Sequence, residues 1–186
     1  MADRLLEYVE RLAAETGRAM PTPNPEGPLS RGRVLFVLRD PGATPESGAN
    51  ATGITDPFVN SDPTAVRFRK AVLGASIDPQ VCVWWNAVPY HLGYKGALRP
   101  SDVMTGARYL RGFIECFADL RVLVAMGEGA HDVMRRLAGD GGRTLPPVIY
   151  APHPMIYGRG ARERMAELSK KLSEVARLAG SPLVSP

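Results

Sequence analysis

The sequence predicts an α/β protein in which helices cover both faces of a central, mostly parallel, four-stranded sheet. Short apolar runs alternate with amphipathic helical segments along the 186 residues. Parallel strands require crossover connections, and right-handed crossovers place helices on both sides of the sheet. The predicted architecture is therefore a three-layer α/β/α domain. The expected strands lie at residues 34–38, 81–85, 122–126 and 148–150.

The helices are predicted from apolar residues that recur at intervals of three and four. Gly17 can close the first helix, and Asp62-Pro63 is a strong start for the second, with Asp as N-cap and Pro in the first turn. Ser101 is the expected start of the third. The expected helices lie within residues 1–18, 62–74, 101–117, 130–137 and 165–175.

Length and composition fit one domain. A chain of this length can bury a full core but is short for two domains, and 45% hydrophobic with 23% charged residues excludes the disordered and fibrous classes. We expect a single domain over residues 1–180 and a disordered tail at 181–186. Residues 1–32 would form a helix and a Pro-rich arm, which either lies across the domain or is mobile.

Charge and cysteine content restrict the setting. A net charge of +4 and a pI near 9.3 suit a polyanionic partner, but also many proteins without one. Cys82 and Cys116 lie in apolar patterns and share no motif spacing, which predicts buried free thiols in a reducing compartment. No stretch approaches the roughly 18 to 20 apolar residues of a membrane span. We therefore expect a cytoplasmic monomer without membrane contact.

Three of the apolar runs end in polar residues that are suited to chemistry: Asp40, Asn86 and His153. Each has an ordinary explanation when taken singly, since Asp-Pro-Gly and Asn favour turns and a His between prolines can be a rigid loop residue. However, the carboxyl ends of parallel strands share the edge at which open α/β sheets bind ligands. The sequence therefore predicts that these three side chains converge on one site.

Five short motifs follow one another along the chain. They are LRDPG at 38–42, DPFV at 56–59, WWNAV at 84–88, VLVAMG at 122–127 and HPM at 153–155. In this order they resemble the motifs of the uracil-DNA glycosylase superfamily. The first motif there reads Gly-Gln-Asp-Pro-Tyr or Gly-Glu-Ala-Pro-Gly, a later strand ends Leu-Leu-Asn-Ala-Val, and the last motif reads His-Pro-Ser. The resemblance spans most of the chain.

This resemblance implies a uracil-DNA glycosylase-like fold and a monofunctional hydrolase that removes uracil or a related deaminated base from DNA. Asp40 would stabilise the cationic sugar and orient or activate water, and His153 would donate a hydrogen bond to the departing base. Asn86 would read the base through its amide donor and acceptor, and Phe58 would stack on it. The predicted base-binding residues are Pro41, Gly42, Phe58 and Asn86.

Departures from the superfamily pattern carry their own implications. Gly42 stands where the best-known branch has a Tyr that blocks the thymine methyl group, which implies a roomier pocket. Branches with Pro-Gly at this point often carry an iron–sulfur cluster on four cysteines, which two cysteines cannot build. The three histidines and two cysteines also lack metal-ligand spacing. We expect no metal and no cofactor.

The residues after His153-Pro154 replace a Ser-rich wedge of the superfamily. Met155, Ile156 or Tyr157 would fill the gap that a flipped base leaves, with Arg159 on a phosphate, or they are ordinary hydrophobic cover. His91 is either a pocket residue or a surface-loop residue, and His131 is expected to be structural.

Two alternatives to a DNA glycosylase remain at this stage. The first is a protein with this fold that binds nucleic acid or a nucleobase without cleaving it. The second is a nucleotide-dependent enzyme, which would need a phosphate cradle. The segment Gly127-Glu128-Gly129 has Asp132 at the third glycine position of a dinucleotide fingerprint, and there is no P-loop sequence.

Overall fold

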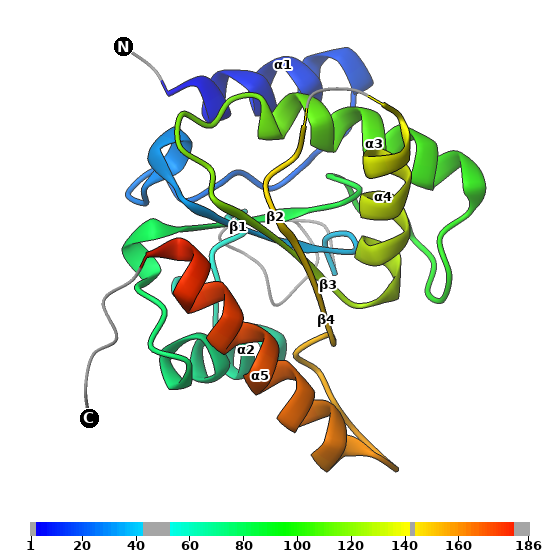
Figure 1. Cartoon of the computed structure of the whole chain (residues 1–186). Helices are drawn as coiled ribbons and strands as arrows, with labels where there is room; N and C mark the ends of the chain where they lie inside the picture. The colour runs from blue at the N-terminus through cyan, green and yellow to red at the C-terminus, as the bar shows by residue number, and fades with distance from the viewer. Residues whose placement is uncertain (1–2, 43–52, 142–143, 181–186) are drawn as a thin grey trace.

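Four parallel strands form the central layer, in the order β2-β1-β3-β4 (Figure 1). The computed structural model describes residues 3–42, 53–141 and 144–180, so the expected tail at 181–186 lies outside the described residues. The predicted α/β fold with a four-stranded parallel sheet is confirmed. The strands are β1 (Val34–Leu38), β2 (Cys82–Asn86), β3 (Val122–Met126) and β4 (Val148–Ala151).

Helices cover both faces of this sheet, as predicted (Figure 1). One face is covered by α1 (Arg4–Thr16), α3 (Pro100–Ile114) and α4 (Glu128–Gly139). The other face is covered by α2 (Pro63–Gly74) and α5 (Ala161–Ala179). Because the sheet is covered twice, the strands are apolar apart from Asn86 at the end of β2, instead of alternating with polar residues.

Successive strand residues pack into opposite layers. Trp85 stacks on Phe113 of α3, with ring centroids 4.3 Å apart. Its neighbour Trp84 lies parallel to Phe36 on the other face, at 6.1 Å, and Phe36 meets Phe68 of α2 edge-on at 5.1 Å. Strand side chains alternate with a period of two. Asn86, two residues after Trp84 and the last residue of β2, is therefore directed to the α2 side of the sheet.

Helix starts follow local capping chemistry. Asp62 caps α2 as predicted, accepting hydrogen bonds from the N–H groups of Thr64 (2.9 Å) and Ala65 (3.1 Å). The predicted start of α3 at Ser101 is wrong by one residue, because Pro100 takes the first position, with Arg99 as an N-cap that makes no side-chain bond. Proline is favoured there since its missing N–H would have no helical partner.

The first residue predicted for the second strand belongs to another element. Val81 ends a 3-10 turn, η2 (Pro79–Val81), which is capped by Asp78 through a 2.9 Å bond from the Gln80 N–H. A second short turn, η1 (Leu29–Arg31), precedes β1. The β2 strand therefore begins at Cys82.

The Pro-rich arm lies across the chain that follows the long loop after β1. The Thr22 N–H donates to the Gly53 carbonyl at 2.8 Å, and the Thr55 N–H donates to the Thr22 carbonyl at 2.9 Å. Further along, the Asn24 amide donates to the Asp56 carboxylate at 2.8 Å. Of the two interpretations of the arm, the structure supports the one in which it lies across the domain.

Both cysteines are buried free thiols. Burial raises the pKa of Cys82 and of Cys116 above the usual thiol value. None of the helices in the described part of the chain is long and apolar enough to cross a membrane.

Candidate active site

A cavity of about 200 Å³ opens at the carboxyl edge of the sheet, and Asp40, Asn86 and His153 all line it. Pro41 and Gly42 of the first motif line it as well. Drug-sized ligand pockets usually measure roughly 300 to 1,000 Å³, so this cavity suits a smaller group such as a single heterocycle.

Asn86 is placed by strand pairing that continues past the end of β1. It pairs with Leu38, and two further bonds join the strand ends, from the Ala87 N–H to the Leu38 carbonyl (2.7 Å) and from the Val88 N–H to the Arg39 carbonyl (2.9 Å). Asn86 is only 8% exposed, yet no described residue forms a hydrogen bond with its side-chain amide. Buried amides normally have hydrogen-bond partners, so a ligand or water in the cavity is expected to fill this role. Both the donor and the acceptor of the Asn86 amide are available to it.

The protonation of His153 follows from its hydrogen bond. The Met155 N–H donates to Nδ1 of His153 at 3.1 Å, so Nδ1 is the acceptor and the neutral ring carries its hydrogen on Nε2. Burial lowers the pKa of His153 below its usual value, which favours this neutral form. The ring is therefore a neutral hydrogen-bond donor at the cavity.

A glycine at the end of β3 makes room for this imidazole. Gly127 has a φ of +81°, and a Cβ added there would lie 3.1 Å from the Cβ of His153. Such a separation is tighter than most Cβ contacts, and L side chains rarely adopt that backbone conformation. Gly127 thus serves both the turn into α4 and the placement of His153.

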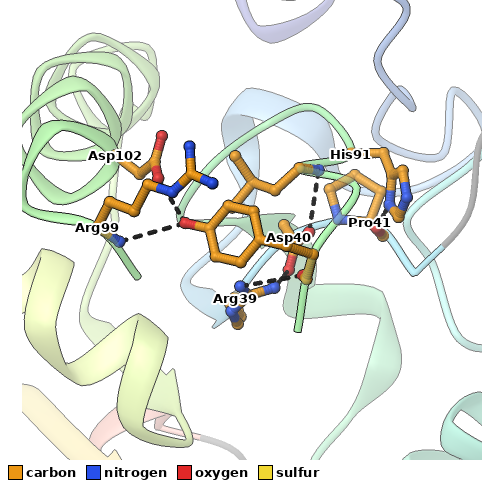
Figure 2. Close-up of polar contacts among 8 residues, drawn as sticks. Arg39, Asp40, Pro41, His91, Arg99 and Asp102 are labelled. Atoms are coloured by element: carbon orange, nitrogen blue, oxygen red, sulfur yellow. Dashed lines mark hydrogen bonds and ion pairs between the residues drawn. The ribbon is translucent and has the colours of Figure 1, made fainter. Parts of the chain in front are cut away.

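Asp40 is held by two donors (Figure 2). Nη1 of Arg39 forms an ion pair with Oδ1, and the Leu92 N–H donates to Oδ2 at 3.3 Å. The side chain is only 8% exposed. Burial raises the pKa of Asp40 above its usual value, and the Arg39 cation and the Leu92 N–H oppose this rise.

His91 holds the same segment from outside the cavity. Its Nδ1 lies 2.9 Å from the Pro41 carbonyl, and since a carbonyl can only accept, Nδ1 is the donor (Figure 2). His91 is not among the residues that line the cavity. It is a loop residue that fixes the Asp-Pro-Gly turn.

Comparison with solved structures identifies the fold. The crystal structure of wild-type SMUG2 from Pedobacter heparinus superimposes with a TM-score of 0.62, covering 95% of this chain and 99% of that chain at 12% sequence identity. This chain has the uracil-DNA glycosylase fold. No family model matches the sequence, and no curated protein matches it either. At this identity the likeness concerns the fold and not the activity.

Within this glycosylase fold, Phe58 does not line the cavity. Its ring packs against Trp84, with centroids 5.7 Å apart and an interplanar angle of 49°, and its N–H donates to Asp56 at 2.8 Å. The residues with aromatic rings that line the cavity, besides His153, are Phe68, Trp84 and Trp85. Phe58 packs against Trp84, and its stacking on a base stays a prediction.

The proposed wedge residues divide between core and surface. Ile156 is 7% exposed and packs in the core between the sheet and the α2 and α5 helices. Tyr157 is 57% exposed, and the guanidinium carbon of Arg67 lies 4.4 Å from its ring centroid. Met155 is half-buried and Arg159 is exposed. Tyr157 is therefore the aromatic of this group that can meet a partner, and Ile156 is core.

Sequence reasoning missed one wall of the cavity. Thr55 and Asn60 line it, together with Asp62 and Thr64 at the first turn of α2. Thr55 is fixed by a 2.5 Å bond from its hydroxyl to the Trp84 carbonyl. The capping pattern at Asp62 was visible in the sequence, but nothing local indicated that this helix begins at the cavity.

A half-buried arginine and a buried asparagine hold that wall in place. Nη1 of Arg69 donates to the carbonyls of Pro57 (2.8 Å) and Asn60 (2.7 Å). The Asn60 amide donates to the carbonyls of Ile54 (2.7 Å) and Asp56 (2.9 Å). Segment 53–60 is thereby fixed to α2 before any ligand binds.

His131 is structural, as expected. Its Nε2 lies 3.1 Å from the Ala125 carbonyl and 3.0 Å from the Ala151 carbonyl, so it donates to the ends of both β3 and β4. This bond ties together the two strands that precede Gly127 and His153. Within residues 3–42, 53–141 and 144–180, no group of three or more His, Cys, Asp or Glu side chains could hold a metal ion.

Proposed function

We propose that this protein is a monofunctional DNA glycosylase that hydrolyses the N-glycosidic bond of uracil or a related deaminated base in DNA. The observation that carries the proposal is one base-sized cavity lined by a carboxylate (Asp40), an unengaged amide (Asn86) and a neutral imidazole (His153). The glycosylase fold supports the same conclusion.

Base recognition falls to Asn86. A base in duplex DNA must leave the stack before its glycosidic bond can be reached, so the enzyme would bind it in a closed cavity. The amide of Asn86 can accept from N3–H of uracil and donate to O4, whereas cytosine presents the opposite pattern at this edge. Such a mismatch would leave buried polar groups unpaired, which makes the discrimination severe.

Bond cleavage separates charge, and the cavity carries groups of the required kind. The C1′–N bond breaks, the pair of electrons leaves with the base as an anion, and C1′ bonds to the oxygen of a water. The proton that this water loses goes to the Asp40 carboxylate, and the released base anion takes a proton from solvent. Ionised Asp40 would stabilise the cationic sugar and orient that water. His153 would donate from Nε2 to O2 of the base anion. The first turn of α2, whose Thr64 and Ala65 line the cavity, adds the positive end of a helix dipole.

The nucleophile in this proposal is water. Among the described residues that line the cavity, none is a lysine, so no amine is at hand to form a covalent intermediate with C1′. The product is therefore an abasic site in an uncut strand.

The base range is proposed to include bases with a substituent at C5. A Cβ added at Gly42 would have no atom of the described residues within 4 Å, so the described part of the chain leaves this side of the cavity open. A bulky residue here would close it, and glycine leaves space for a methyl or hydroxymethyl group.

A second candidate is a protein that binds the base without cleaving it. It is favoured by one observation: both oxygens of Asp40 already have partners, in Arg39 and the Leu92 N–H. A carboxylate that is fully neutralised by these partners would not assist a cationic sugar.

Labelled oligonucleotides separate the two candidates. Uracil would be presented opposite G, opposite A and in single strands, and the products treated with alkali to reveal abasic sites. The glycosylase proposal expects cleavage by the wild type and loss of cleavage, with binding retained, in Asp40→Asn. Tight binding of uracil-containing DNA by the wild type without abasic product would overturn it in favour of the second candidate.

A further inference from the structure

We propose that Arg39 is a positioning residue that orients the Asp40 carboxylate at the cavity, and that Tyr94 in the loop between β2 and α3 holds Arg39 in place. This inference rests on the proposed function, because Asp40 is the carboxylate that the reaction needs.

Arg39 is fixed on several sides. Nη1 pairs with Oδ1 of Asp40, and Nη2 donates to the Tyr94 carbonyl at 3.3 Å. Its guanidinium carbon lies 5.1 Å from the centroid of the Tyr94 ring. On another side is Gly129 of α4, where an added Cβ would lie 2.7 Å from Cγ of Arg39. A glycine at this position therefore leaves a slot for the arginine stem.

Tyr94 is itself anchored to the start of α3. Its hydroxyl donates to the Asp102 carboxylate at 2.5 Å and accepts from the Arg99 N–H at 3.2 Å. The guanidinium carbon of Arg99 lies 4.6 Å from the ring centroid. Figure 2 shows Arg99 and Asp102 beside the Arg39 and Asp40 pair. A continuous series of contacts therefore runs from α3 through Tyr94 and Arg39 to Asp40.

The positive charge of Arg39 matters because Asp40 is buried and needs a nearby cation to stay ionised. Asp40 is buried, and burial favours its protonated form, in which it could not stabilise a cationic sugar. Among the described residues, the groups that act on this carboxyl are Arg39, the Leu92 N–H and His91, and Arg39 opposes the effect of burial most strongly. Removing Arg39 would therefore raise the pKa of Asp40 further and keep it protonated to higher pH.

The first test is the pH profile of single-turnover excision from a uracil-containing oligonucleotide, for wild type, Arg39→Gln and Arg39→Lys. In Arg39→Gln the acid limb is expected to move to higher pH by at least about one unit, since an adjacent opposite charge shifts a carboxyl pKa by roughly 1 to 3 units. Arg39→Lys keeps the positive charge, so its acid limb should lie close to that of the wild type. An unchanged limb in Arg39→Gln would overturn the proposal.

A matched control is available on the chain. Arg121 pairs with Asp119 at 2.9 Å just before β3, at the opposite end of the sheet, and both side chains are exposed. Arg121→Gln removes the same side chain from another close Arg–Asp pair, and its pH profile should match that of the wild type. Tyr94→Leu should shift the limb in the same direction as Arg39→Gln, because the platform for Arg39 is lost. An unshifted acid limb in Tyr94→Leu would show that Tyr94 does not hold Arg39 in place.

A second measurement does not depend on activity. The carboxyl carbon of Asp40, assigned by comparison with Asp40→Asn, would be titrated by NMR in ligand-free wild type and Arg39→Gln. An upward shift of its midpoint in Arg39→Gln supports the inference even if the wild type excises no base, which would refute the proposed function alone. An unchanged midpoint refutes the inference alone. If Arg39→Gln fails to fold by thermal melting, Tyr94→Leu carries the same two measurements, with Arg39→Lys as the variant that keeps the charge.

Discussion

The backbone N–H of Met155 donates to Nδ1 of His153 across 3.1 Å, and this bond decides which end of the imidazole can serve a ligand. Nε2 is left as the donor. Replacing His153 by Ala should lower the single-turnover rate about 10²- to 10³-fold, as is typical when one donor to a developing anion is removed. ¹⁵N chemical shifts of the ring would report the tautomer directly, and a hydrogen on Nδ1 in the ligand-free protein would contradict this assignment.

The lowered pKa of His153 makes stability depend on pH. In the unfolded chain this ring takes up a proton near its ordinary pKa of 6.5, whereas the buried ring takes it up at lower pH. The unfolded state therefore binds more protons as the pH falls below about 6.5, and folding stability falls with it. Urea unfolding at several pH values should show a smaller loss on acidification in His153→Ala than in the wild type.

Asp40 carries a cost in stability that its removal should reveal. Its pKa is raised by burial, so its ionised form is disfavoured in the folded protein, and its contribution to stability declines as the pH rises through the folded pKa. Asp40→Asn should therefore gain stability relative to the wild type at neutral pH, with a smaller gain in acid. Thermal melts at matched pH values would measure this, and a destabilised Asp40→Asn at neutral pH would mean that its ion pair with Arg39 outweighs burial.

Asn86 should contribute to ligand affinity and little to folding. Each hydrogen bond of its amide to a base is worth about 0.5 to 1.5 kcal/mol, so Asn86→Ala should weaken binding of uracil-containing DNA on the order of 10- to 100-fold. Fluorescence anisotropy in an Asp40→Asn background would measure this without cleavage. The melting temperature should change little, since no described residue bonds to the amide. Unchanged affinity would exclude Asn86 from base reading.

Gly42 should control the size of the accepted base. Because an added Cβ there meets no atom of the described residues within 4 Å, Gly42→Tyr should fold and narrow the cavity. Excision of 5-hydroxymethyluracil should fall relative to uracil, measured as the ratio of kcat/KM values. Gly139→Tyr is a control, since position 139 is equally open but lies at the end of α4. An unchanged ratio in Gly42→Tyr would show that the base does not approach this residue.

Gly127 should affect stability and catalysis together. Gly127→Ala combines backbone strain at a φ of +81° with pressure on the Cβ of His153. Gly17→Ala is a control for an ordinary left-handed conformation, with a φ of +64° and no described atom within 4 Å of the added Cβ. It should lose about 1 to 2 kcal/mol of stability, the usual cost of that conformation for an L residue. Gly127→Ala should lose more, since its φ of +81° with a ψ of 166° is a conformation that essentially only glycine adopts. A loss of excision rate confined to Gly127→Ala would demonstrate displacement of the imidazole.

Features with a local cause could be predicted from the sequence. The apolar runs predicted the strands of the sheet. The strand-end positions of Asp40, Asn86 and His153 predicted the polar part of the cavity, because parallel strands share one carboxyl edge. The predicted start of α3 was one residue late, because the helix begins at Pro100 and not at Ser101.

Features that depend on distant contacts could not be read in this way. Whether Phe58 enters the cavity depends on how Asp56, Asn60 and Arg69 fold the 53–60 segment. The contact of Arg39 with Tyr94 joins residues 55 positions apart and leaves no local pattern. Neither the periodicity nor the motif order carries information on such pairs.

The two groups assigned to the proposed chemistry follow the first and the last strand of the chain. Asp40 follows β1, the first strand to be synthesised, and His153 follows β4, the last, which joins the sheet only through β3. A chain in which β4 has not yet paired with β3 therefore lacks the imidazole beside Asp40. If the proposed function holds, base excision during refolding would appear only once β4 is in place, and its time course would report completion of the sheet.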